Sequence, residues 1–202
     1  MGRPINVDTI DDFIPIQTVF ATATDKSGLV SNKVLDKDGK PTGNHLEGVP
    51  DNGIIGYLFD ANPDAVVIST GGTAKLIGNA GYKVVEISDF TGWAEMETGL
   101  VKSMHPKLYV GMLAHPHTPS DAAYMAEHNL DPVDLVLVNF YAFEKTAVEH
   151  PLQENPRNFE ILRQAMDVGG PTSAHTSRKG FLTTAVTTRP EDYTLFTCDM
   201  MG

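Results

Sequence analysis

Short apolar runs alternate along the chain with longer segments of mixed polarity, which is the pattern of an α/β domain. Five apolar or β-branched runs predict strands. Two of them, at residues 65–70 and 134–140, are apolar at nearly every position, as expected for strands buried on both faces of a parallel sheet. The predicted strands span residues 18–24, 65–70, 83–88, 134–140 and 182–187.

Helical patterns lie between these strands. Residues 73–80 predict a short helix that ends at Gly81, a residue that favours helix termination. A second helix is predicted at 121–128 with Ser120 as its N-cap, and a third at 157–166. Because strands and helices alternate, we predict an α/β fold: a single doubly wound, mostly parallel sheet with helices on both faces, in three layers.

The length of 202 residues suits a single domain covering residues 1–202, with a core at about 17–195. Residues 36–53 are rich in Gly, Pro, Asn and Asp and contain Asp38-Gly39, so they predict an insertion that carries a turn. Residues 115–120 and 150–156 contain proline and are predicted to be loops.

The charge and cysteine content exclude several functions. A net charge of −11 argues against an extended nucleic-acid surface or an anionic membrane as partner, because both need clustered basic residues. Cys198 is the only cysteine, so no intrachain disulfide is expected. We find neither a signal-peptide pattern nor an apolar run long enough to span a membrane, and we therefore expect a cytoplasmic protein.

Ligands of open parallel sheets bind beyond the carboxyl ends of the strands, and two glycine-containing turns are predicted there. Residues 69–73, Ser-Thr-Gly-Gly-Thr, open a helix and would offer backbone N–H groups and the helix dipole to an anion. Residues 24–28, Thr-Asp-Lys-Ser-Gly, follow the first strand. Each turn alone is also compatible with an ordinary connection. Together, at neighbouring strand ends, they favour a shared phosphate pocket.

Three further segments carry candidate chemistry. Lys102 lies in a predicted loop, 99–107, where it is either a surface charge or a cation that polarises a carbonyl group. Asn139 and Tyr141 follow the most apolar strand and either line a site or, for the tyrosine, pack at the edge of the core. Asp167 precedes Gly-Gly-Pro at a predicted helix start and is either a functional carboxylate or a helix cap.

These segments, in this order, resemble the inosine monophosphate cyclohydrolase domain, the N-terminal part of the bifunctional purine biosynthesis protein. The resemblance implies a fold like that of methylglyoxal synthase. It also implies a hydrolase that closes the ring of 5-formamidoimidazole-4-carboxamide ribotide to inosine monophosphate, the last step of de novo purine biosynthesis, with no metal and no other cofactor. It covers residues 17–195 and rests on residues 69–74, 88–96, 101–107, 134–143 and 167–170.

The resemblance also implies which residues act. Lys102 is expected to stabilise charge on the formyl oxygen, Tyr141 to orient the amide or pass a proton, and Asp167 to accept the amide proton. Lys179, twelve residues after Asp167, completes the catalytic group and is expected to keep that carboxylate ionised. The residues expected to bind the phosphate and the rest of the substrate are Thr22, Ala23, Thr24, Lys26, Ser69, Gly71, Gly72, Thr73, Val101, Ser103, Asn139, Gly169 and Gly170.

The chain departs from the family pattern at a few positions. Leu100 and His175 stand where the family usually has arginine, which removes two bidentate donors, with His175 or Arg178 as partial substitutes. Ala142 stands in place of a proline. Two other functions of the same fold therefore stay open: a methylglyoxal synthase-like lyase that eliminates phosphate, and a non-catalytic regulatory module that binds purine nucleotides.

The resemblance implies partners as well. They are a small-molecule purine ribotide, a second copy of the chain in a homodimer, and a separate aminoimidazole carboxamide ribotide formyltransferase, since no formyltransferase domain is expected within these residues. The alternative is that the chain is a fragment of a longer protein. His115 and His117 have ligand-like spacing, but without a neighbouring cluster of ligands they predict no metal site.

Overall fold

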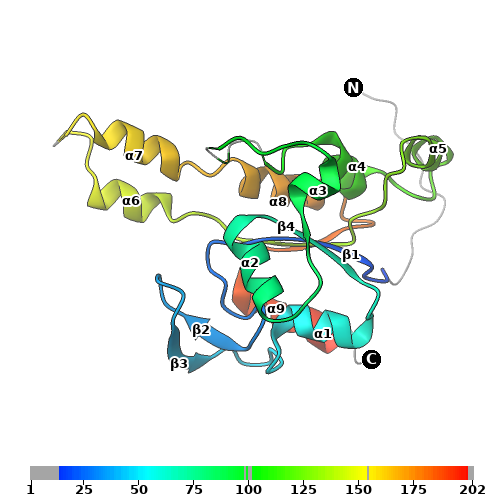
Figure 1. The fold of residues 1–202 in the computed structure, drawn as a ribbon, viewed down its shortest axis with the longest axis horizontal. Helices are drawn as coiled ribbons and strands as arrows, with labels where there is room; N and C mark the ends of the chain where they lie inside the picture. Colours follow the sequence, from blue (N-terminus) through cyan, green and yellow to red (C-terminus); the bar gives the residue numbers. More distant parts are fainter. Residues whose placement is uncertain (1–13, 98, 100–101, 154, 200–202) are drawn as a thin grey trace.

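The computed structural model describes residues 14–97, 99, 102–153 and 155–199 (Figure 1). Within them the chain forms a five-stranded sheet of order β5-β4-β1-β6-β7, in which every neighbouring pair of strands is parallel. The predicted α/β fold is therefore confirmed, and each predicted strand is present in shorter form. The strands of this sheet are β1 (Thr18–Thr22), β4 (Val66–Ser69), β5 (Val85–Glu86), β6 (Leu135–Val138) and β7 (Ala185–Thr187).

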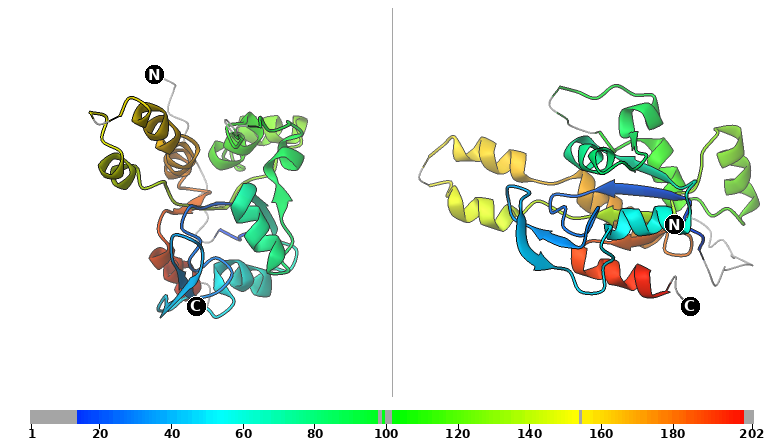
Figure 2. Two further views of the ribbon diagram at one scale, coloured as in Figure 1. Left: turned by 60° about the vertical axis from the view of Figure 1, so that its left-hand side comes forward. Right: turned by 60° about the horizontal axis from the view of Figure 1, so that its bottom comes forward.

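Helices cover both faces of the sheet (Figures 1 and 2). Alternate residues of β1 belong to different cores: Val19 and Ala21 lie in one buried cluster and Phe20 in the other, as the two-residue period of a strand requires. The first cluster includes residues of α1 (Gly53–Ala61), α2 (Gly71–Asn79) and α9 (Tyr193–Asp199). The second includes residues of α3 (Ile87–Thr91) and α4 (Pro106–Leu113), with a residue of α8 (Gly169–Lys179) packed against it.

The connections define a switch point between β1 and β6. The chain leaves β1 for the face covered by α1, whereas it leaves β6 for the face covered by α8. Strands β1 and β6 are neighbours. Connections that diverge to opposite faces leave a crevice at the carboxyl ends of the two strands, and the site described below lies there.

Residues 33–45 form an antiparallel hairpin of β2 (Lys33–Leu35) and β3 (Pro41–His45). Its turn contains Asp36, whose carboxylate accepts hydrogen bonds from the backbone N–H groups of Asp38 and Lys40 at 2.9 Å each. The buried helix α1 follows, and it was not predicted. Its two glycines lower the intrinsic helix propensity, and burial of Ile54, Ile55 and Leu58 against the sheet compensates for them.

Three local predictions are wrong in detail. Helix α5 (Pro119–Glu127) has Thr118 rather than Ser120 at its N-cap. Proline is favoured in the first helical turn because its missing N–H is not needed there. For the same reason the predicted loops 99–107 and 115–120 are wrong at their ends, because Pro106 begins α4 and Pro119 begins α5.

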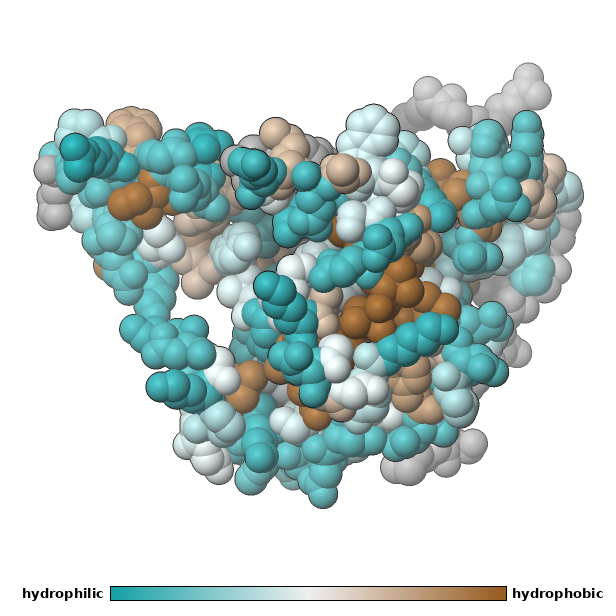
Figure 3. Space-filling view, in the orientation of Figure 1, coloured by the Kyte–Doolittle hydropathy of each residue, from teal (hydrophilic) through white to brown (hydrophobic). Residues whose placement is uncertain are grey.

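Helices α6 (Phe143–Glu149) and α7 (Asn158–Ala165) form an arm that projects beyond the sheet (Figure 1). Helix α7 was predicted, but α6 was not, since it has no buried residue and hence no clear apolar face. The arm exposes Val148 and Phe159, and Figure 3 shows apolar side chains on its surface. A short 3₁₀ helix, η1 (Pro190–Asp192), precedes α9. Across the described residues, no helix is long and apolar enough to cross a membrane.

Candidate functional site

Asn139 joins the carboxyl ends of β1 and β6. Its Oδ1 accepts hydrogen bonds from the backbone N–H groups of Thr24 (2.7 Å) and Asp25 (2.9 Å), and its Nδ2 donates to the carbonyl oxygen of Asp25 (2.7 Å). The side-chain amide is thus directed at the turn of residues 24–28. Asn139 lies in the pocket wall, and its hydrogen bonds fix the shape of that turn.

Ser69 and Thr73 connect the end of β4 to the end of β1. The fully buried Ser69 hydroxyl donates to the carbonyl oxygen of Ala21 at 2.7 Å. Thr73 Oγ1 donates to the carbonyl oxygen of Ala23 and accepts from its N–H, both at 3.1 Å. Both hydroxyls therefore hold the two strand ends together, and the Ser69 side chain does not reach the pocket.

The Gly71-Gly72 turn presents the N-terminus of α2. Gly71 has φ +51°, which glycine adopts without strain. The helix has no side-chain cap and no acidic residue in its first turn. A Cβ atom added to Gly71 would lie 3.5 Å from Lys102 Nζ, and one added to Gly72 would lie 3.6 Å from Lys26 Cε. Two lysines thus meet at the positive end of a helix dipole, an arrangement that an anion stabilises.

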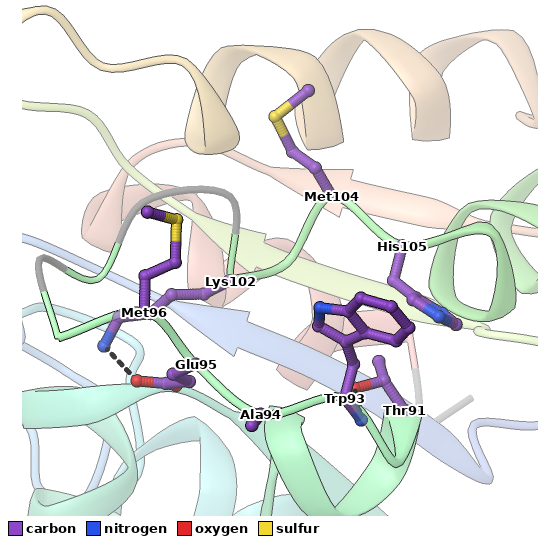
Figure 4. Close-up of a pocket in the computed structure, with 8 residues that line it drawn as sticks. All are labelled: Thr91, Trp93, Ala94, Glu95, Met96, Lys102, Met104 and His105. Carbon is purple, nitrogen blue, oxygen red and sulfur yellow. Dashed lines mark hydrogen bonds and ion pairs between the residues drawn. The ribbon is translucent and has the colours of Figure 1, made fainter.

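Lys102 forms an ion pair with Glu95, with 2.9 Å between Nζ and Oε2 (Figure 4). Sequence reasoning placed Glu95 in a segment shared with the family but assigned it no role. The pair borders a smaller cavity of about 340 Å³, lined in part by Trp93, Met96 and Met104. Trp93 is 73% exposed, so this cavity has an open, apolar edge.

Asp167 connects the end of β6 to the start of α8. Its Oδ1 accepts a hydrogen bond from the N–H of Gly170 at 3.0 Å, and its Oδ2 accepts from the N–H of Tyr141 at 3.4 Å. A Cβ atom on Gly170 would lie 2.8 Å from Oδ2, so a side chain at this position would displace the carboxylate. Asp167 thus caps an N–H group at the helix start and also lines the pocket, and its functional role stays a prediction.

These elements enclose one pocket of about 460 Å³, a size typical of small-molecule sites. Sequence reasoning missed Gln164 and Met166 in its wall, because nothing in their local pattern distinguishes them from packing residues. Thr70 and Val168, which also line it, lie in segments that the sequence singled out, but neither was named as a site residue. The predicted site residues that line the pocket are Thr22, Ala23, Thr24, Lys26, Gly71, Gly72, Thr73, Lys102, Ser103, Asn139, Tyr141, Asp167, Gly169 and Gly170.

Lys179 is not among the residues that line this pocket. It is the exposed last residue of α8, ten residues after Gly169, which corresponds to about 15 Å along a helix axis. Its expected role beside Asp167 stays a prediction that this arrangement does not support. His175 and Arg178 are exposed on the same helix, with 3.2 Å between Nδ1 and Nη2, and also lie outside the pocket lining.

Val101 and Leu100 lie outside the described residues, so the predicted contact of Val101 stays a prediction. Within the described part of the chain, no group of three or more His, Cys, Asp or Glu side chains is arranged to hold a metal ion.

Comparisons with known proteins agree with this architecture. A family model described as the MGS-like domain matches residues 61–172. The bifunctional purine biosynthesis protein PurH of Rhodospirillum rubrum is 39% identical over 135 residues, which are 67% of this chain and 24% of the relative. PurH of Neisseria meningitidis is 37% identical over 134 residues, which are 66% of this chain and 24% of the relative.

The chain thus spans about a quarter of the length of these curated relatives. A solved structure described as the crystal structure of ForH superposes with a TM-score of 0.61 at 25% identity, covering 91% of this chain and 77% of that one. The resemblance to the bifunctional purine biosynthesis protein, first identified from short motifs, is confirmed by these matches.

Proposed function

The chain belongs to the MGS-like domain family, and from this membership we propose that it is a purine-biosynthetic enzyme that forms inosine monophosphate by ring closure. Its similarity to PurH supports a role in purine biosynthesis. One observation carries the specific step: two lysines converge on an uncapped helix start, and a tyrosine and an aspartate line the same pocket.

The phosphate of the ribotide is proposed to bind at the Gly71-Gly72 turn. Backbone N–H groups at the start of α2 point toward such an anion, and the helix dipole adds to their attraction. Lys26, whose Nζ donates to the carbonyl oxygen of Thr24 at 3.2 Å, provides a positive charge beside the turn. Phosphate binding would thereby relieve the repulsion between Lys26 and Lys102.

The reacting groups are proposed to lie between Lys102 and Asp167. The carboxamide nitrogen forms a bond to the formyl carbon, the formyl oxygen gains charge, and Lys102 stabilises that charge. Asp167 accepts a proton from the nitrogen. The former formyl oxygen gains two protons, the one lost by the carboxamide nitrogen and one from the formamide N–H, and leaves as water while the formamide nitrogen forms a C=N bond, which balances the ring closure. Tyr141 is proposed to orient the amide.

In this proposal, the orientation of the substrate's reacting groups supplies much of the rate enhancement of ring closure. Nucleophile and electrophile belong to the same molecule, so a site that holds the formyl group folded toward the carboxamide avoids most of the entropic cost of the encounter. The chemistry uses only proton transfers and one addition–elimination, and it therefore needs no cofactor. A phosphate anchored at one end of a pocket of about 460 Å³ is suited to impose that geometry.

An ultraviolet assay of purified protein with 5-formamidoimidazole-4-carboxamide ribotide, without added cofactor, tests the proposal. We expect inosine monophosphate to form, and loss of turnover in Lys102→Ala. Binding of inosine monophosphate without turnover would instead indicate a regulatory module, and release of phosphate from dihydroxyacetone phosphate would indicate a lyase.

The proposal includes the remaining partners that the resemblance implies. A formyltransferase must supply the formylated ribotide, and the protein is proposed to act as a homodimer. Light scattering of the purified chain tests the dimer, with a monomer mass as the contradicting result.

A further inference from the structure

Lys102 lies at the boundary between two cavities. It lines both the large pocket described above and the smaller cavity beside Trp93 and Met96. Figure 4 shows the Lys102 ammonium and the Glu95 carboxylate pointing toward each other. The direction of the Lys102 side chain therefore decides which cavity its charge faces.

The part of the large pocket next to the Gly71-Gly72 turn does not attract this charge. The start of α2 and Lys26 both repel an ammonium group that lies against the Gly71-Gly72 turn. The oppositely charged group beside Lys102 is Glu95, at 2.9 Å. The two side chains are 27% and 28% exposed, so the pair is only partly screened by solvent.

The backbone at Gly99 leaves space for the aliphatic part of the Lys102 side chain. A Cβ atom on Gly99 would lie 2.7 Å from Lys102 Cε, so the stem passes directly over this glycine. Met104 borders both cavities and adds an apolar surface beside the pair. The lysine is thus confined by Gly99 along its stem and by Glu95 at its end.

We propose that Glu95 is a positioning residue, which holds the Lys102 ammonium at the boundary between the two cavities so that it faces the reacting oxygen. This inference rests on the proposed function. Glu95 lines the smaller cavity but is not among the residues that line the large pocket. It therefore acts through Lys102 and should affect turnover more than substrate binding.

Steady-state kinetics of Glu95→Gln, Glu95→Asp and Glu95→Ala test this. Misplacement of a catalytic group by about 1 Å can cost on the order of 100-fold in rate, so we expect kcat of Glu95→Gln to fall by about 10- to 100-fold. KM should change less than about threefold, because the phosphate contacts remain. Glu95→Asp keeps the charge and should recover part of kcat.

Glu97→Gln is the matched control, since it removes the same charge two residues away and Glu97 lines neither cavity. It should leave kcat and KM unchanged. A double-mutant cycle gives the sharper result. If Glu95 acts only through Lys102, adding Glu95→Gln to Lys102→Ala should have no further effect on kcat. Additive losses, or an unchanged kcat in Glu95→Gln, would overturn the proposal.

A readout independent of turnover separates this inference from the proposed function. The side-chain NMR signal of Lys102, assigned by its absence in Lys102→Ala, should move in Glu95→Gln and stay in place in Glu97→Gln. If the ribotide is not converted but the signal moves, the proposed reaction is wrong and the positioning role stands. If the ribotide is converted but neither kcat nor the signal changes, the positioning role alone is wrong.

Discussion

The amino ends of the parallel strands form one edge of the central sheet, the amino edge, and their carboxyl ends form the other, the carboxyl edge. Each contains an aspartate that accepts two backbone hydrogen bonds, yet the surroundings of the two aspartates differ. At the amino edge, Asp134 Oδ2 accepts from the N–H groups of Gln17 and Thr18, both at 2.8 Å, and the residue is only 9% exposed. At the carboxyl edge, Asp167 also accepts from two N–H groups, and it faces a pocket that Lys26 and Lys102 line as well.

The neighbours of the two carboxylates explain the difference. Asp134 also borders a cavity, of about 410 Å³, but no lysine or arginine among the described residues lines it. Nearby, the buried Thr184 Oγ1 donates to the carbonyl oxygen of Val133 at 2.8 Å. Near Asp167 the edge holds two lysines and an uncapped helix start. We infer that the amino edge contributes stability and that the carboxyl edge keeps charged groups available to a ligand.

The largest expected effect is that of Lys102→Ala. Removing a group that stabilises transition-state charge lowers kcat by about 10²- to 10³-fold, while the midpoint of urea unfolding should change little because the ion pair with Glu95 is partly exposed. Lys75→Ala, at an exposed position of α2, serves as the control. Full activity in Lys102→Ala would show that the carboxyl edge does not act as proposed.

Exchanging each aspartate for asparagine compares the two edges directly. Asp167→Asn removes the proposed proton acceptor and should lower kcat by about 10²-fold. Asp134→Asn leaves the pocket intact, so its kcat should match that of the parent chain. Equal kcat values for the two variants would contradict the division between the edges.

Asp134→Ala tests the contribution of the amino edge to stability. The buried N–H of Thr18 loses its acceptor, which should lower the free energy of unfolding by about 1–3 kcal/mol. Urea titration followed by circular dichroism measures this change. Asp134→Asn retains an acceptor oxygen and should lose less, and equal losses in both variants would rule out the hydrogen bonds as the cause.

A smaller effect is expected in the pH dependence of stability. Burial raises the pKa of Asp134 above 3.8, although hydrogen bonds from the N–H groups of Thr18 and Gln17 oppose this. The folded state then binds more protons than the unfolded state, so the contribution of Asp134 to stability falls as pH rises from about 4 through its folded pKa. In Asp134→Asn this fall should disappear from the unfolding free energies measured between pH 4 and pH 7.

The smallest effect is expected for Lys179→Ala. Because Lys179 lies at the opposite end of α8 from Asp167, its removal should change kcat by less than about threefold. A loss as large as that of Lys102→Ala would show that Lys179 has the catalytic role implied by the family resemblance and that it reaches the site through another arrangement.

Much of the fold followed from local pattern. Residues 65–70 and 134–140 are apolar on both faces, and only a parallel sheet covered by helices buries such strands. Helix α6, by contrast, was missed because none of its residues is buried, and α1 was missed because its glycines weaken the local helical signal. Helix α1 depends on its packing against the sheet, and helix α6 depends on its position in the arm.

The sequence predicted which types of residue form the site, but not the directions in which their side chains point. Glycines, hydroxyls and lysines at strand ends indicate an anion pocket, and that inference needs only sequence order and the geometry of parallel sheets. The sequence could not show that the Ser69 hydroxyl points at Ala21 rather than at a ligand, because side-chain direction depends on which neighbouring carbonyl groups need a donor.

The sequence by itself therefore determined the parallel sheet, the two glycine turns and the residue types that meet at its carboxyl edge, since hydrophobic period, propensity and the order of elements along the chain can be read directly from it. Only the tertiary structure decided that Glu95 pairs with Lys102 and that helix α8 separates Lys179 from Asp167. Contacts across loops and the rise of a helix place side chains in three dimensions, and spacing along the chain does not encode those distances.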